Sequence, residues 1–174
     1  MRPRDGVDGP WSTFNLGVGR PVQEFRGIPG TSSPMVMLPT NSAACNKNSS
    51  NACRDRIIFN PQNPSYTPAG FYDLPLSVTF DPIFPDAKSA EWGSDEVFMG
   101  FNPGRDLGVA RQYIAQVPSI NLFLGIFGLS VGRVGFSAEI RPTLLSALLE
   151  AGSAPSNSFS YTAGCASSEL LPAL

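Results

Sequence analysis

The chain has 174 residues, and its 12 lysine and arginine residues against 14 aspartate and glutamate residues give a formal net charge of −2 at pH 7. The basic residues are scattered, which excludes a basic face for nucleic acid or anionic lipid. Histidine is absent, which removes Ser/His and Cys/His nucleophile systems and most zinc sites. We find no metal-ligand spacing and expect neither a metal nor a cofactor.

Short segments between turn residues dominate the sequence. Seventeen glycines and seventeen prolines are spread along it, a pattern typical of many brief strands and not of a helical bundle. In residues 74–80, apolar side chains alternate with Pro75, Ser77 and Thr79, as in a half-buried strand. The predicted strands are 11–18, 22–28, 35–38, 57–59, 74–80, 96–101, 111–117, 123–129 and 158–162. The sequence therefore predicts an all-β fold.

One short helix is predicted near residues 142–151. Pro142 suits a first helical turn, and Gly152 can end the helix. Four leucines at helical spacing form an apolar stripe. They are Leu144, Leu145, Leu148 and Leu149. We expect this helix to pack against the core.

The cysteines and a sequon indicate the compartment. Cys45 and Cys53 lie in a polar stretch typical of an exposed loop. We favour a disulfide that closes this loop, which indicates an oxidising compartment; two unpaired surface thiols are the alternative. Asn48 begins an Asn-Ser-Ser glycosylation sequon in the same loop. We expect a secreted or cell-surface protein, and we identify no partner for Cys165.

The amino-terminal residues do not resemble a signal peptide. The first six residues, MRPRDG, lack the apolar segment of a signal peptide. The longest apolar stretch, residues 120–129, is too short to span a bilayer. We expect a segment of a longer protein, with any signal or membrane anchor outside it.

Three local patterns occur in the order found in the amino-terminal lobe of pepsin-like aspartic peptidases. Residues 15–25, with a Gly-Arg-Pro turn between two apolar segments, resemble the opening hairpin of that family. The region from Cys45 to Tyr66 is similar to its small disulfide loop and the Phe-x-Pro and Ser-aromatic elements that follow. Residues 123–129, FLGIFGL, resemble its Phe-Asp-Gly-Ile-Leu-Gly-Leu strand.

The resemblance implies a fold and an origin. Residues 1–163 would form the amino-terminal lobe, a closed or partly open β-barrel with a crossed psi loop and one short helix. Residues 164–174 would be a linker towards a missing carboxy-terminal lobe. The combination is similar to fungal pepsin-like proteins, secreted or membrane-anchored, with a degenerate first active-site motif. An unrelated secreted β-sandwich is the alternative fold.

The catalytic signature of the family, Asp-Thr-Gly-Ser-Ser, is degenerate here. The corresponding loop consists of Pro29, Gly30, Thr31, Ser32 and Ser33. Aligning the serines puts Pro29 in the place of the aspartate. The family's reaction needs two carboxylates that share one proton, and proline can neither accept a proton nor donate a backbone N–H. We therefore expect no catalytic residue in this loop.

A second active-site element also departs from the family. Leu124 stands where an aspartate usually precedes the Gly-Ile-x-Gly strand. The stretch that corresponds to the flap, residues 77–93, has two prolines and no tyrosine, which argues against a regular hairpin. Trp92 would lie near the flap tip or, in our preferred interpretation, pack in the core.

The sequence therefore predicts a catalytically inactive lobe that serves as a binding or structural module. Its expected partner is an extended peptide or protein in the former cleft. The alternative is an aspartic endopeptidase in the two-lobed protein, with a carboxylate supplied from elsewhere. The candidates are Glu24, Asp55, Asp73 and Asp81. An isolated lobe would expose Trp11, Phe14 and residues near Phe159, so we also expect self-association.

Overall fold

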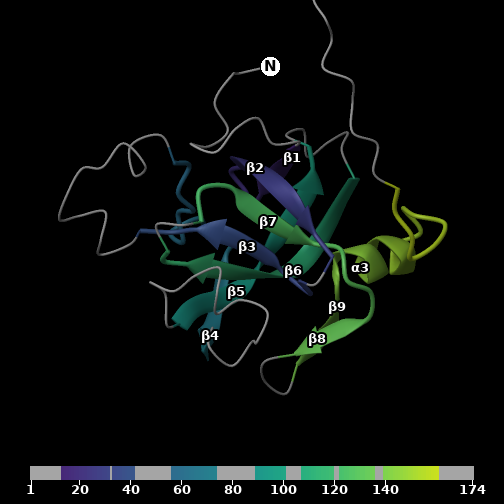
Figure 1. Cartoon of the computed structure of the whole chain (residues 1–174). Coiled ribbons are helices and arrows are strands. Elements are labelled where there is room, and N and C mark those ends of the chain that lie inside the picture. The colour runs from purple at the N-terminus through teal and green to yellow at the C-terminus, as the bar shows by residue number, and fades with distance from the viewer. Residues whose placement is uncertain are drawn as a thin grey trace, which may run out of the picture.

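The computed structural model describes residues 13–31, 33–41, 56–73, 89–100, 107–119, 122–135 and 139–160. This part of the chain is mostly β-strand with one short helix (Figure 1), so the all-β prediction is confirmed. The strands are β1 (Phe14–Val18), β2 (Gln23–Gly30), β3 (Val36–Pro39), β4 (Thr67–Asp73), β5 (Ser89–Met99), β6 (Leu107–Val117), β7 (Gly125–Gly128), β8 (Arg133–Gly135) and β9 (Ile140–Pro142), and the helix is α3 (Leu144–Glu150).

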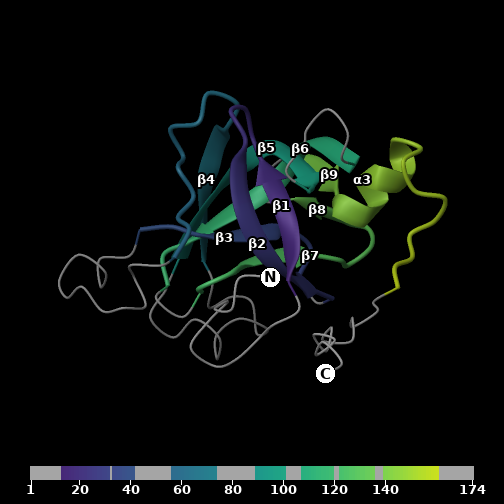
Figure 2. The same cartoon turned by 90° about the horizontal axis from the view of Figure 1, so that it is seen from above.

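Six strands close into a barrel. Their order is β1-β2-β7-β3-β6-β5, and β5 pairs back with β1 to complete the ring. Closure leaves no free strand edge within the ring. β4 continues the sheet beyond β5, and β8 with β9 forms a separate two-stranded ribbon. Seen from above, β1 and β2 lie between β4 on one side and α3 on the other (Figure 2).

β7 is inserted between two strands that are consecutive in the chain, β2 and β3. It runs parallel to β2 and antiparallel to β3. The connection between β2 and β3 therefore crosses the end of β7. At the crossing, the N–H of Leu129 donates to the carbonyl of Gly30 at 2.9 Å, and the N–H of Ser130 donates to the carbonyl of Ser33 at 3.3 Å. This crossing brings residues 29–33 and 127–130 side by side.

Aromatic and aliphatic side chains fill the barrel. The ring of Phe59 lies 6.2 Å from that of Phe25 and meets Tyr66 edge-on at 5.2 Å between centroids. A second cluster is built around Trp92, which is buried against Tyr113 at 5.1 Å. The preferred core position of Trp92 is confirmed. The fully buried side chains at the centre of the barrel include Leu16, Val18, Phe25, Val36, Leu38, Val97 and Ile114.

The helix prediction is confirmed in position and corrected at its end. Leu144, Leu145 and Leu148 are buried against the barrel, as the spacing predicts. Leu149 is exposed, because the apolar face of this short helix is covered only along one side. Gly152 follows the helix with φ of +69°, a left-handed conformation that glycine adopts without steric strain.

The flap prediction, that residues 77–93 do not form a regular hairpin, stays a prediction, because the structure describes only residues 89–93 of this stretch. β4 and β5 pair antiparallel, with Gly70 opposite Trp92 and Thr67 opposite Ser94. A register shift between Pro68 and Gly70 accommodates the proline. The segment 74–88, which holds the two flap prolines, lies outside the described residues.

Two predicted strands are not formed where the structure describes them. Residues 57–59 are irregular, although the N–H of Phe59 still donates to the carbonyl of Pro39 at 2.8 Å. Residues 158–160 are also irregular. Several predictions fall outside the described residues and stay predictions. They concern Trp11, Ser32, Cys45, Asn48, Cys53, Cys165, the strand 74–80 and the linker 164–174. In the described residues, no helix has the length and apolar character needed to cross a membrane.

We predict that Gly128→Ala lowers the free energy of unfolding by about 3 kcal/mol, because overpacking against rigid atoms forces the backbone to move. A Cβ at Gly128 would lie 2.3 Å from the carbonyl oxygen of Ser33 and 2.8 Å from the backbone of Met35. Urea unfolding measures the difference.

Gly125→Ala is the matched control on the same strand. The nearest atom to its Cβ would be the flexible tip of the Leu38 side chain, at 3.1 Å. We therefore expect the free energy of unfolding to fall by less than about 1 kcal/mol. Equal losses in the two variants would contradict the close backbone approach at the strand crossing.

Candidate functional site

The loop that begins with Pro29 lies at the end of β2, beside the strand crossing. Pro29 stands opposite Phe127 in the parallel β2–β7 register. Ser33 is buried, and its hydroxyl donates to the carbonyl of Met35 at 2.8 Å and accepts the N–H of Met35 at 3.3 Å. Gly30 accepts from Leu129. The Ser33 hydroxyl and the Gly30 carbonyl are thus occupied by the fold, and residues 29–33 include no acidic or basic side chain.

An apolar cavity of about 350 Å³ opens beside this loop. Pro29 and Thr31 form part of its wall. Distant elements supply the rest of the wall, which consists of Phe14, Met99, Phe127, Leu129, Leu145, Phe159 and Ser160. We call it the Pro29 cavity. Its described lining contains no acidic or basic side chain, so it suits apolar groups and not a polarised water.

Aromatic rings at the rim of the Pro29 cavity are open to solvent. Phe14 is 39% exposed and contacts Phe127 edge-on at 5.7 Å between centroids. Phe159 is 48% exposed. The predicted exposure of Phe14 and of the region near Phe159 is confirmed. Sequence reasoning did not identify Met99 and Leu145 as lining residues, because only the closed barrel brings β5 and α3 to this loop.

The candidate replacement carboxylates do not reach the Pro29 cavity where the structure describes them. Glu24 is exposed on β2, opposite Gly17, and does not line the cavity. The side chains of Asp55, Asp73 and Asp81 lie outside the described residues. Leu124 is half-buried next to β7. Within the described residues, nothing supplies the missing acidic group.

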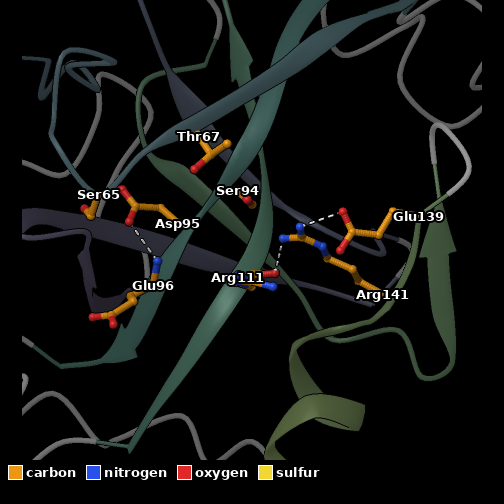
Figure 3. A pocket seen from close by; sticks show the side chains of 8 residues that line it. All are labelled: Ser65, Thr67, Ser94, Asp95, Glu96, Arg111, Glu139 and Arg141. Carbon is orange, nitrogen blue, oxygen red and sulfur yellow. Dashed lines mark hydrogen bonds and ion pairs between the residues drawn. The ribbon is translucent and has the colours of Figure 1, made fainter.

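A second, polar cavity of about 360 Å³ lies over the β5–β6 pair. Figure 3 shows its lining side chains, with Asp95 beside Ser65 and Arg111 beside Arg141. Hydroxyl groups from Thr67 and Ser94 also line it. We call it the Asp95 pocket. Sequence reasoning did not find this pocket, because its three carboxylates, two arginines and three hydroxyl residues come from separate segments and show no common spacing.

Asp95 is the most buried charged group of this pocket, with 3% of its surface exposed. Its Oδ1 accepts the backbone N–H of Glu96 at 2.8 Å, whereas Oδ2 has no hydrogen-bond partner among the described residues. Burial raises the pKa of the Asp95 carboxyl above its ordinary value, and the nearby Ser65 hydroxyl and the Glu96 N–H offset part of this rise. A buried acceptor without a donor is unfavourable for the fold.

Most other charges around the Asp95 pocket are already paired. Glu96 accepts from Nε of Arg20 at 2.6 Å, and Glu139 accepts from Arg141 at 2.8 Å. The hydrogen bond from Arg141 lowers the pKa of the Glu139 carboxyl. Arg141 also donates to the backbone carbonyl of Arg111 at 2.9 Å and lies over the ring of Tyr113. These contacts hold Arg141 in place as part of the wall.

Comparisons with known proteins add no assignment. No protein-family model matches this chain, and no curated protein matches it significantly in sequence. Within the described ranges, no group of three or more acidic or cysteine side chains could hold a metal ion. The candidate sites are therefore defined by their geometry.

We predict that Asp95→Asn stabilises the chain at pH 7 by about 1 kcal/mol, because the amide removes a buried charge that lacks a full set of donors. Because the folded-state pKa of Asp95 is raised, the protonated carboxyl favours the folded state. This contribution to the free energy of unfolding is complete below the unfolded pKa, about 3.9, and is lost as pH rises through the folded pKa. The stabilisation by Asn should therefore grow from acid to neutral pH. Urea unfolding across this range measures it.

Glu24→Gln removes an exposed carboxylate of β2 and serves as the control. Since this side chain is solvated, we expect the change to leave stability within about 0.5 kcal/mol. A stability difference for Asp95→Asn that stays constant with pH would contradict the burial argument.

Proposed function

We propose that this chain is a non-catalytic pepsin-like lobe that binds an extended peptide through apolar side chains in the Pro29 cavity. The observation that carries the proposal is Pro29 itself, at the end of β2, beside an apolar cavity whose described lining holds no acidic residue. In the same proposal, the chain works outside the cell, with a Cys45–Cys53 disulfide, an Asn48 glycan and a second lobe that follows the linker.

The strand order supports the pepsin-like part of the proposal. The resemblance predicts a crossed loop around residues 28–34 and 123–129, and β7 is inserted between β2 and β3 at this place. A helix with a buried leucine face comes after β7 in the chain. A β-sandwich consists of two separate sheets packed face to face, whereas here six strands form one ring that the pairing of β1 with β5 closes. These features favour the lobe over the unrelated β-sandwich.

The chemistry of the loop supports the non-catalytic part. An aspartic peptidase activates water with two carboxylates that share a proton, and general acid–base participation is worth roughly 10²–10⁴ in rate. Pro29 provides neither a carboxylate nor an N–H. The Ser33 hydroxyl is bound to Met35 and buried, so it cannot replace the missing group. A single carboxylate from a second lobe would not make a pair.

The cavity supports the peptide-binding part. An exposed apolar surface with a concave shape is typical of an interaction site, and a volume of about 350 Å³ is at the small end of ligand cavities. It can accept one or two apolar side chains of a bound peptide. Specificity in extended-peptide recognition comes from such pockets for individual side chains.

The proposal predicts that Phe14→Ala and Phe159→Ala each weaken peptide binding by at least about tenfold, which corresponds to about 1.4 kcal/mol. Both rings line the cavity and are partly exposed, so their removal should leave the fold intact. A library of extended peptides with apolar side chains provides the ligand, and fluorescence anisotropy measures the dissociation constant.

Phe71→Ala is the matched control, because this ring on β4 is 81% exposed and does not line the cavity. Equal losses in all three variants, or the absence of any peptide binding at about 1 mM, would favour a purely structural module. Peptide hydrolysis at acid pH by the two-lobed protein, blocked by a statine-type inhibitor, would instead support the alternative endopeptidase.

A further inference from the structure

Two residues that are unfavourable for the fold face the Asp95 pocket. Asp95 is buried with an unpartnered Oδ2. Arg111 has φ of +56° and is not a glycine, so its backbone is in the left-handed region that side chains disfavour. Backbone strain of this kind concentrates at functional sites. The coincidence of a strained arginine and an unsatisfied carboxylate in one cavity suggests a ligand that uses both.

A β-bulge positions Arg111. Asp95 is opposite Gln112 and Val97 is opposite Val109, so Ala110 and Arg111 together face the single residue Glu96. An extra residue in one strand re-aims the side chains beside it. Because the bulge lies next to Asp95 in the β5–β6 register, it brings Arg111 into the wall of the pocket that Asp95 also lines.

The charges of the pocket leave one group of each sign for a ligand. Glu96 is paired with Arg20, and Glu139 is paired with Arg141. The side chain of Arg111 makes no hydrogen bond or ion pair with the described residues; only its backbone carbonyl is used, by Arg141. After these pairs are subtracted, Asp95 has no ion pair in the described part of the chain. Arg111 forms no ion pair there either, although its charge helps to lower the pKa of the Glu139 carboxyl, which Arg141 already holds.

We propose that the Asp95 pocket binds a small zwitterion, an amino acid or a compound of similar size, with its ammonium group on the carboxylate of Asp95 and its carboxylate on Arg111. A ligand with a single charge would satisfy one group and be repelled by the other. The pocket volume of about 360 Å³ suits a ligand of this size. The buried Nε of Arg141, also without a hydrogen-bond partner among the described residues, is a further donor for a carboxylate.

The hydroxyl residues of the pocket fit the same ligand class. Thr67 and Ser94 come from neighbouring strands and line the cavity together with Ser65. Hydroxyl oxygens accept hydrogen bonds and can share the three protons of an ammonium group with Asp95. Charge-assisted hydrogen bonds at both ends of the ligand are about twice as strong as neutral ones. This site is separate from the Pro29 cavity and does not depend on the proposed peptide binding.

The test uses the whole chain and a series of linear amino acids, from glycine to 6-aminohexanoate, in isothermal titration calorimetry. Butylamine and butyrate serve as singly charged controls. We expect at least one zwitterion to bind with a dissociation constant below about 1 mM, and both singly charged compounds to bind at least about tenfold more weakly. The length of the best zwitterion then reports the separation of the two charged groups.

Arg111→Gly separates binding from folding. Glycine relieves the left-handed backbone, so the melting temperature should rise by about 2–4 °C, while zwitterion affinity falls at least about tenfold. Arg111→Asn, which also tolerates this conformation, should lose affinity likewise. Asp95→Asn should lose affinity while remaining folded. Arg133→Gln removes an arginine outside the pocket, and we expect unchanged affinity.

The proposal is overturned if no zwitterion binds at about 10 mM, or if butylamine or butyrate binds as tightly as the best zwitterion. It is also overturned if Arg111→Gly and Asp95→Asn keep the parent affinity. A fall in melting temperature for Arg111→Gly would assign Arg111 a structural role and contradict the strain argument. Tenfold losses in both variants with a stable fold support the site.

Discussion

The insertion of β7 between β2 and β3 is the constraint on which the rest of this fold depends. Consecutive strands usually lie next to each other, yet here the connection from β2 to β3 crosses the end of β7. The backbones approach so closely that a Cβ at Gly128 would lie 2.3 Å from the Ser33 carbonyl oxygen. β7 joins the β1–β2 pair to the β3–β6–β5 group, and β5 can then return to β1 and close the ring.

Much of the barrel could be predicted from the sequence, because most of its strands and its helix have a local signal. The leucine spacing fixed the helix, and apolar segments beside turn residues located β1, β2, β3 and β7. β4 could not be predicted, because Pro68 and Gly70 are typical turn residues; pairing with β5 through a register shift overrides that local preference. Conversely, Ile57, Ile58 and Phe59 have high strand propensity but gain no strand partner among the described residues.

The two cavities differ in how far sequence could predict them. Pro29 was identifiable because the loop that contains it is a contiguous stretch of sequence, and the exposure of Phe14 was an expectation from the resemblance. The Asp95 pocket depends on the pairing register of β5 and β6, which places a bulge beside a buried carboxylate. The conformation of Arg111 also has no signature in composition or spacing. Such features arise from tertiary pairing and become visible only in the folded chain.

The framework around Asp95 explains why its unpartnered oxygen persists. β5 pairs with β1, β4 and β6, so the backbone at Asp95 cannot move towards solvent without breaking ladder hydrogen bonds on both sides of its strand. The pocket is therefore preorganised, and a ligand there would lose little free energy to rearrangement. The rings of Phe14 and Phe159 at the Pro29 cavity are partly exposed instead and can change rotamer as a ligand binds. The polar pocket is thus suited to select by charge, whereas the apolar cavity is suited to accept side chains of different shape.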